Sequence, residues 1–406
     1  MHIDPSFRPH IRRRAPAVAL VLLIVGLGVF STGIRAVEPG EPLTIGRYVK
    51  YWSKALGEER TLLITTPAGY ERLDRRHPVV YVLDGEGNHI LAAAVTNFLA
   101  RNNQMPPAIV VSITNTSRTR DFTPTAAADR PGSGGGAKFM EFFKTELVPW
   151  VEQNYRTEPY RILVGHSLCG MYAIWTMLAE PDLFQGLVAV SPYVMWDNDY
   201  VVRLAAERLA AIPDTRRSLF ITLGNEPDYK PALGRFLKLM KEKAPENTAC
   251  RFVPLENETH GSVLLESIHR GLAAIYSGWQ PSGDLLTLGL KGLEEHYRQL
   301  SRKYGYTIEV PEAMLNQLGY LYLQQRKDSD AAITVFRRNV ELFPNSANVY
   351  DSLGEALEQT GQLEEAARAY REAVSRAEKN PDANLNIYRQ NLARAEAACK
   401  EKSKTP

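Results

Sequence analysis

The sequence of 406 residues predicts an α/β domain with a mostly parallel central sheet, followed by an all-helical domain. Short β-branched runs alternate with helical stretches over roughly the first two thirds of the chain. From residue 285 onward the pattern is helical and repeats itself with a period near 34 residues. The chain is too long for one typical domain and is about right for two.

The predicted strands are short apolar runs bounded by turn residues, which suits strands buried on both faces. Residues 43–66 are expected to form antiparallel strands near the start of the sheet. The predicted strands are 61–65, 79–83, 109–113, 162–164, 187–190, 219–223 and 251–255. The predicted helices between them are 89–102, 136–153, 168–179, 201–211, 230–243 and 262–276. This alternation indicates a parallel sheet that helices cover on both sides.

Several residues of the C-terminal region recur in the sequence at nearly the same spacing. Leu318-Gly319 recurs as Leu353-Gly354, 35 residues later, and Phe336 recurs as the aromatic Tyr370, 34 residues later. Small residues at a period near 34, where paired helices touch, are typical of tetratricopeptide repeats.

A change of composition around 281–284 predicts the boundary between the two folded parts. We therefore expect a catalytic domain over 37–280 and a tetratricopeptide-like (TPR-like) domain over 285–402. Two repeats are fewer than such an array usually needs. Residues 285–303 and 383–402 are therefore expected to form flanking helices, unless the repeat pair packs on the catalytic domain.

Residues 1–36 have the order of an export segment, with a basic cluster, an apolar run over 17–30 and then small residues. The segment holds five Arg and one Asp, a net charge of 5 − 1 = +4. The apolar run is shorter than the ~20 residues that span a bilayer. A cleaved signal peptide and an uncleaved N-terminal membrane anchor both remain open. Either would place the catalytic domain outside the cytoplasm, as a periplasmic or other extracytoplasmic protein.

The overall charge argues against a nucleic-acid partner, because 48 Lys and Arg against 46 Asp and Glu leave a net charge of only +2. The three cysteines, Cys169, Cys250 and Cys399, are odd in number and scattered. They form neither a disulfide framework nor a metal-ligand spacing. The sequence therefore predicts no metal site.

One serine stands in the context of a nucleophile elbow. The segment Gly165–Gly170 reads Gly-His-Ser-Leu-Cys-Gly, follows a predicted strand and precedes an apolar helix. Ser167 is the predicted nucleophile, and Gly165 lies two residues before it. Cys169 takes the place of the usual second glycine and is small enough to fit. The alternative is a serine that only caps a helix.

A serine nucleophile needs a base that takes its proton. Of the eight histidines, His260 is favoured, since it lies in a polar loop after the last predicted strand. The acid that orients it is expected after the preceding strand, where Glu226 is the first choice and Asp228 the second. A Ser–His dyad without an acid also remains open.

Two backbone N–H groups should stabilise the oxyanion of the tetrahedral intermediate. One is expected from Leu168, directly after the nucleophile. The other is expected from the loop after Asp84, at Gly85 or Glu86.

Several segments together resemble the esterase D-like family of α/β hydrolases, which includes siderophore (enterochelin-type) esterases, S-formylglutathione hydrolase, feruloyl esterases and mycolyltransferases. The matching segments are Tyr81–Gly85, Arg118–Pro124, Gly165–Gly170, Ser191-Pro192, Trp196-Asp197, Asn225-Glu226 and Glu258–Gly261. The helical tail resembles the tetratricopeptide extension of a bacterial subset.

The resemblance implies an α/β-hydrolase fold and a serine esterase that needs no cofactor. It also implies that Arg120, Asp121 and Trp196 line or brace the substrate pocket. The alternatives are a loop salt bridge for the first two and a core aromatic for Trp196.

The leading functional interpretation is hydrolysis of a small-molecule carboxylic ester through an acyl-enzyme. Two alternatives stay open: transfer of the acyl group to an alcohol or sugar, and a protein-binding role for the repeat domain on a hydrolase scaffold. A siderophore substrate is not favoured, because no basic cluster beyond Arg118 and Arg120 stands out near the predicted site.

Overall fold

The computed structural model describes residues 43–71, 74–380 and 382–403. The described residues from Ile45 onward form one compact unit. The segment predicted as a signal peptide or membrane anchor, 1–36, lies outside the described residues. Within the described ranges, no helix combines the length and the apolar character that crossing a membrane requires.

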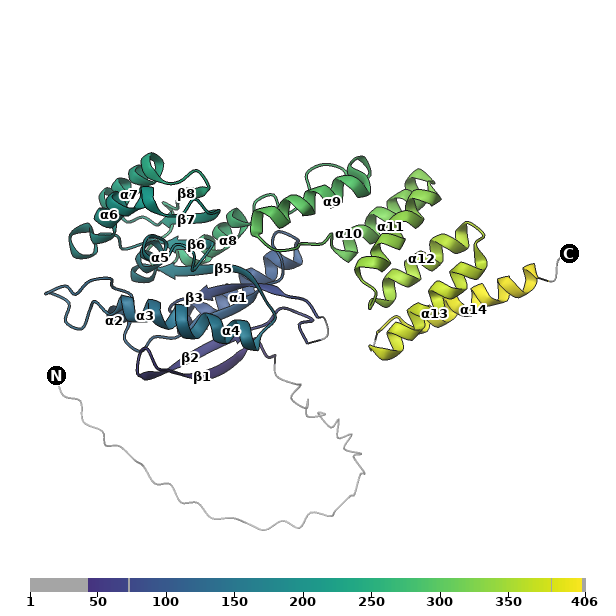
Figure 1. Ribbon diagram of the computed structural model, residues 1–406, viewed down its shortest axis with the longest axis horizontal. Coiled ribbons are helices and arrows are strands. Elements are labelled where there is room, and N and C mark those ends of the chain that lie inside the picture. Colours follow the sequence, from purple (N-terminus) through teal and green to yellow (C-terminus); the bar gives the residue numbers. More distant parts are fainter. Residues whose placement is uncertain (1–42, 72–73, 381, 404–406) are drawn as a thin grey trace, which may run out of the picture. The chain divides into compact units, whose positions relative to one another are not determined.

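An eight-stranded sheet in the order β1-β2-β4-β3-β5-β6-β7-β8 forms the centre of the N-terminal part (Figure 1). β1 and β2 form an antiparallel pair, β2 is antiparallel to β4, and every later neighbour is parallel. The strands are β1 Arg47–Ser53, β2 Glu58–Thr65, β3 His77–Val82, β4 Ile109–Ile113, β5 Thr157–His166, β6 Gly186–Val190, β7 Arg217–Leu223 and β8 Thr248–Pro254.

Helices cover both faces of this sheet, and alternate residues of each central strand therefore enter two different cores. In β3, Val79 and Tyr81 belong to the core beneath α3 to α7, whereas Val80 and Val82 belong to the core beneath α1 and α8. The helices are α1 Gly85–Arg101, α2 Arg118–Asp121, α3 Gly136–Phe142, η1 Phe143–Leu147, α4 Val148–Asn154, α5 Leu168–Ala179, α6 Trp196–Arg208, η2 Leu209–Ala211, η3 Pro227–Tyr229, α7 Lys230–Lys243 and α8 Leu264–Ile275.

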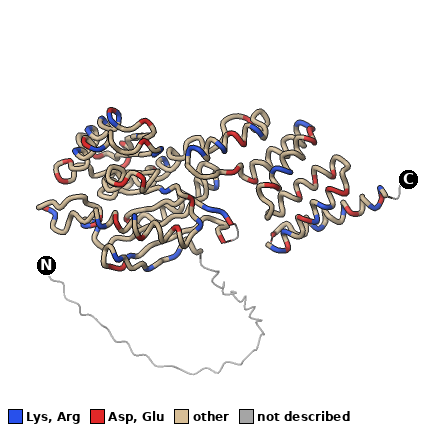
Figure 2. The backbone as a smooth tube through the Cα atoms, viewed as in Figure 1, with Lys and Arg blue, Asp and Glu red and all other residues tan. Residues whose placement is uncertain are grey.

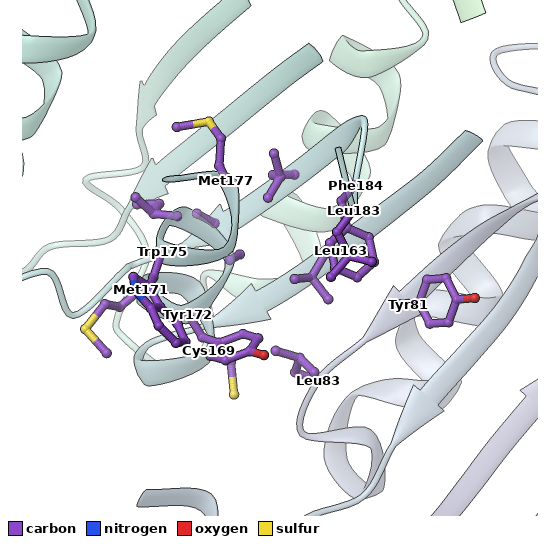
Figure 3. Close-up of a cluster of buried hydrophobic side chains, with 14 of the residues drawn as sticks. Tyr81, Leu83, Leu163, Cys169, Met171, Tyr172, Trp175, Met177, Leu183 and Phe184 are labelled. Carbon is purple, nitrogen blue, oxygen red and sulfur yellow. The ribbon is translucent and has the colours of Figure 1, made fainter. Parts of the chain in front are cut away.

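The core beneath α5 fixes the start of that helix against the sheet. Figure 3 shows Cys169, Tyr172 and Trp175 of α5 beside Leu83 and Leu163, which come from the β3 end and from β5. Cys169 and Tyr172 are fully buried. The first turn of α5 therefore has little freedom to move, and Ser167, which immediately precedes it, is held equally firmly.

The C-terminal part is helical and follows the predicted repeat. Its helices are α9 Leu285–Tyr304, α10 Glu312–Tyr320, η4 Leu321–Arg326, α11 Ser329–Leu342, α12 Ala347–Gln359, α13 Leu363–Lys379 and α14 Leu385–Lys402. A Cβ at Gly319 would lie 2.5 Å from the Phe336 ring, and one at Gly354 would lie 2.7 Å from the Tyr370 ring. The repeated glycine and aromatic positions are thus the points where the two helices of each pair touch. Figure 2 shows acidic and basic residues interspersed along these helices.

The predicted boundary near residue 281 does not coincide with a gap in the packing. Tyr160 of β5 contacts Tyr304 of α9, with ring centroids 5.1 Å apart, and Trp279 and Tyr297 belong to the same buried cluster. Helix α9 therefore completes a buried core that the sheet begins. The division into domains over 37–280 and 285–402 stays a prediction.

The predicted fold class is confirmed: a mostly parallel sheet between helices, followed by helical repeats. The predicted helices 168–179 and 230–243 match α5 and α7 at both ends. The flanking helices expected beside the repeats correspond to α9 and α14. The sequence did not predict the short helix α2, which has only four residues.

The close approach at Gly165 gives a stability prediction. A Cβ there would lie 2.2 Å from the Cys169 carbonyl oxygen and 2.4 Å from its carbon. Because backbone atoms of a buried helix start cannot move aside, we expect Gly165→Ala to lower the free energy of unfolding by about 2–4 kcal/mol. Urea denaturation followed by circular dichroism measures this.

The matched control is Gly234→Ala in the exposed face of α7, where no atom lies within 4 Å of the added Cβ. This substitution should be neutral or stabilise by up to ~1 kcal/mol. Equal effects at the two positions would contradict the steric account.

Candidate active site

Ser167 occupies a sharp turn between β5 and α5. Its backbone angles are φ 61° and ψ −117°, a region that a residue with a side chain enters only under constraint. Hydrogen bonds fix the turn on both sides: Ser167 N donates to Val190 O at 2.9 Å, and Tyr193 N donates to Ser167 O at 3.0 Å. Gly165 and Gly170 permit the close approach of strand and helix, since a Cβ at Gly170 would lie 2.9 Å from Val190 O. The serine is thus presented at the carboxyl end of the parallel strands, where α/β sheets place their sites.

His260 and Glu226 are brought together from two loops on the same edge of the sheet. His260 Nδ1 forms a very short hydrogen bond with Glu226 Oε1. The contact leaves Nε2 as the ring nitrogen that can accept a proton. Glu226 is nearly buried, whereas Asp228 is exposed. The structure therefore pairs His260 with the first predicted acid rather than with the second.

Ser191 holds the other oxygen of the Glu226 carboxylate, and the sequence reasoning gave it no role. Its hydroxyl forms a very short hydrogen bond with Glu226 Oε2, which also accepts from Gly224 N at 3.0 Å. Ser191 is fully buried and has φ 40°, so its backbone too is held in an unusual conformation. The only available signal was its position directly after a predicted strand, within a segment that carried the family resemblance.

His166 lies against His260, with the two ring centroids 4.4 Å apart. Burial, and after it the neighbouring His260, lower the pKa of His166 to about 4. His166 is therefore neutral near pH 7.

The predicted oxyanion groups lie at the beginnings of two helices. Leu168 is the first residue of α5, while Gly85 and Glu86 are the first two residues of α1. The first N–H groups of a helix have no acceptor within the helix and carry its positive dipole end. Each of these residues can therefore offer a backbone donor to an anionic oxygen.

Asp84 and Arg118 link these two helix starts. Asp84 adopts left-handed angles, φ 54° and ψ 48°, and its carboxylate accepts from Arg118 Nε at 2.8 Å and Nη2 at 3.0 Å. Asn115 and Cys169 donate to the same carboxylate, at 2.7 and 3.3 Å. Arg118 also donates to the carbonyl of His166 at 3.2 Å, which lies next to the nucleophile. Cys169 was expected only to pack, but its thiol also donates a hydrogen bond to Asp84 in the loop before α1.

Arg120 and Asp121 belong to an ion-pair network with Glu58 and Arg60. The Asp121 side chain is 1% exposed and accepts from Arg60 at 2.6 Å and from Arg120 at 2.7 Å. Arg120 also pairs with Glu58 at 2.5 Å. Both carboxylate oxygens of Asp121 are thus engaged, one with buried Arg60 and the other with the partly exposed Arg120, and its role at a substrate pocket stays a prediction. The ion pair between Arg120 and Asp121 fits the alternative of a loop salt bridge.

Trp196 is a buried aromatic at the start of α6. It is 4% exposed, and its indole N–H donates to Thr125 Oγ1 at 3.1 Å. This burial fits the alternative of a core aromatic, and a role of Trp196 at a substrate pocket stays a prediction. Among the described residues, no group of three or more His, Cys, Asp or Glu could hold a metal ion.

The fold and the arrangement around Ser167 define the class of α/β hydrolases. Comparison with known proteins narrows this class. Residues 53–258 match the family model described as "Putative esterase", and residues 311–379 match a tetratricopeptide repeat model. The chain belongs to this esterase family and is a carboxylic-ester hydrolase with a tetratricopeptide region.

Two curated relatives and one solved structure are similar to the chain. Ferri-bacillibactin esterase BesA of Bacillus subtilis is 26% identical over 55% of this chain and 83% of its own length. The siderophore triacetylfusarinine C esterase of Aspergillus fumigatus is 23% identical over 50% of this chain and 82% of its own length. An IroE-like serine hydrolase from Shewanella oneidensis has the same fold, with a TM-score of 0.64 and 24% identity over 73% of this chain and 99% of its own.

The Asp84–Arg118 pair leads to a pH-dependent stability prediction. Burial raises the pKa of Asp84, but the bonds from Arg118, Asn115 and Cys169 outweigh burial and lower the pKa overall. An acid whose pKa is lowered by folding stabilises the protein above its unfolded pKa, and this contribution is lost as the pH falls through the folded value. At pH 7, Arg118→Met should therefore cost about 1–3 kcal/mol of unfolding free energy.

Urea denaturation between pH 7 and about pH 2 tests this, because the lowered pKa of Asp84 places its protonation below the usual range of an aspartate. The gap between the wild type and Arg118→Met should narrow toward the acid end, because a protonated Asp84 no longer needs the arginine. The control is Arg368→Met, which removes an exposed pair with Glu365 at 4.0 Å and should change stability by less than about 0.5 kcal/mol. A gap that is independent of pH would show that Arg118 acts through packing alone.

Proposed function

We propose that this esterase acts through an acyl-enzyme on Ser167, with His260 as the base and Glu226 as the acid that orients it. The observation that carries the proposal is the Glu226–His260 hydrogen bond beside a serine held at φ 61°. Serine becomes nucleophilic when an oriented imidazole accepts its proton, and the carboxylate stabilises the imidazolium that results.

The proposed reaction has two steps. Ser167 Oγ attacks the ester carbonyl while His260 Nε2 takes its proton, and the N–H groups of Leu168 and of Gly85 or Glu86 bind the developing oxyanion. The imidazolium then returns the proton to the departing alcohol, which leaves the acyl group on Ser167. Water activated by His260 releases the acid by the reverse sequence of proton transfers.

The names of the relatives suggest which substrate class to test first. Two relatives are named for esters of siderophores, so a siderophore that contains ester bonds is the first candidate. A panel of acyl esters of increasing chain length, assayed beside such a siderophore, would rank the substrate classes. Product analysis with an added alcohol or sugar would separate hydrolysis from acyl transfer.

The repeat region supports a separate proposal, that it binds a protein partner. Its helices enclose a polar pocket of about 390 Å³. The pocket is lined by Glu355, Glu358, Gln359, Tyr370, Asn391 and Arg394. A pocket with both charge signs suits a polar peptide segment better than an apolar helix.

A matched pair of acids tests the assignment of Glu226. Replacing Glu226 with Gln removes the charge that stabilises protonated His260, so kcat should fall by about 10²–10⁴-fold. Asp228→Asn removes a charge two residues away that is exposed, and it should leave kcat within about threefold, because exposed charges interact weakly through water. Hydrolysis of a p-nitrophenyl ester gives both values. A large loss at Asp228 with little loss at Glu226 would overturn the assignment.

A further inference from the structure

Tyr229 lies against the imidazole of His260, the base of the proposed reaction. It ends the short η3 helix that directly follows Glu226, and its N–H donates to Glu226 O at 3.1 Å. Its ring meets His260 edge-on, with centroids 5.7 Å apart and an interplanar angle of 61°. A second ring, that of Tyr193, packs on it at 5.5 Å. The phenol is thus held between a fixed turn and two aromatic neighbours.

The Ser167 side chain lies near enough to the Tyr229 hydroxyl to act on its pKa. Burial, followed by the Glu226 carboxylate, raises the pKa of Tyr229 above its usual value. The phenol therefore keeps its proton throughout the neutral and mildly alkaline range. It can donate a hydrogen bond there but does not act as a base.

The position of Tyr229 distinguishes it from the oxyanion donors. Those donors, at Leu168, Gly85 and Glu86, lie at the N-termini of α5 and α1. Tyr229 lies instead on the loop after β7 and contacts the His260 ring. In acyl transfer from an ester, the imidazolium must face the oxygen of the departing alcohol, since it returns the proton there. The ring of Tyr229 contacts the imidazole that must return this proton, so its phenol adjoins the alcohol side of the scissile bond.

We propose that Tyr229 is a further catalytic residue, whose hydroxyl donates a hydrogen bond to the alcohol-side oxygen of the ester as the acyl-enzyme forms. The proposal rests on Ser167 being the nucleophile. The bond between Ser167 Oγ and the acyl carbon forms, and the bond between that carbon and the alcohol oxygen breaks. The electron pair of the broken bond stays on the alcohol oxygen, which takes its proton from His260. Tyr229 keeps its own proton and stabilises the negative charge while it develops.

The test uses leaving groups of different strength with one acyl group. An alkyl alkoxide is a poor leaving group and needs the hydrogen bond, whereas p-nitrophenoxide disperses its own charge. For Tyr229→Phe, kcat/KM for methyl butyrate should therefore fall about 10–100-fold, as for the loss of a donor to developing charge. For p-nitrophenyl butyrate it should fall by less than about threefold, because little charge remains to be stabilised. The ratio kcat/KM reports the steps through acylation, so slow deacylation does not mask the difference.

Tyr193→Phe is the matched control, since it removes a hydroxyl from the other ring of the same aromatic pair. It should lower kcat/KM equally, and by less than about threefold, for the two esters. Equal losses for both esters in Tyr229→Phe, or no loss for either, would overturn the proposal. Failure of the nucleophile assignment is visible separately, because Ser167→Ala would then keep its activity on p-nitrophenyl butyrate.

Discussion

The backbone of Ser167 is the constraint on which the rest of the site depends. A residue at φ 61° and ψ −117° is unfavourable by itself, so the surrounding structure must hold it there. Gly165 allows the backbone of Cys169 to approach, and Val190 O accepts from Ser167 N. The parallel sheet supplies this acceptor, because β5 and β6 are paired up to their last residues. The sheet register thus sets the orientation of a single hydroxyl.

Two polar networks extend this constraint outward. Arg118 bonds both to Asp84, directly before α1, and to the carbonyl of His166, close to the start of α5. The two helix starts that carry the predicted oxyanion donors are therefore linked by hydrogen bonds. Ser191 and Gly224 hold Glu226, and Glu226 in turn holds His260. Because the carboxylate makes several bonds, its orientation does not depend on His260 alone. Such support from neighbouring residues is what keeps reacting groups within a small fraction of an ångström of their working positions.

Local patterns in the sequence were sufficient for the fold, and they singled out the three side chains of the proposed reaction. Apolar runs predicted the strands of the sheet. The spacing of glycine and aromatic residues predicted paired helices, and Gly319 and Phe336 lie where one such pair of helices touches. The elbow around Ser167 could be recognised because its geometry requires small residues at fixed short distances along the chain. Glu226 and His260 could be placed because each follows a strand on the same edge of the sheet.

The residues that sequence reasoning missed or misplaced act through contacts between distant segments. Ser191 contacts Glu226 across 35 residues, and Arg118 contacts Asp84 across 34, and no local pattern reveals either pair. Asp121, expected to line or brace the pocket, pairs with Arg60, which is buried in the core and lies 61 residues away. Only the three-dimensional packing shows which charged side chains face solvent and which face each other.

The most direct measurement of the central claim is peptide mapping of the full chain after reaction with a fluorophosphonate. Such a reagent phosphonylates a nucleophile that an adjacent base has activated, with loss of fluoride. The account predicts one adduct per chain, on the peptide that contains Ser167. An adduct on another residue, or an active ester hydrolase that carries no adduct, would contradict it.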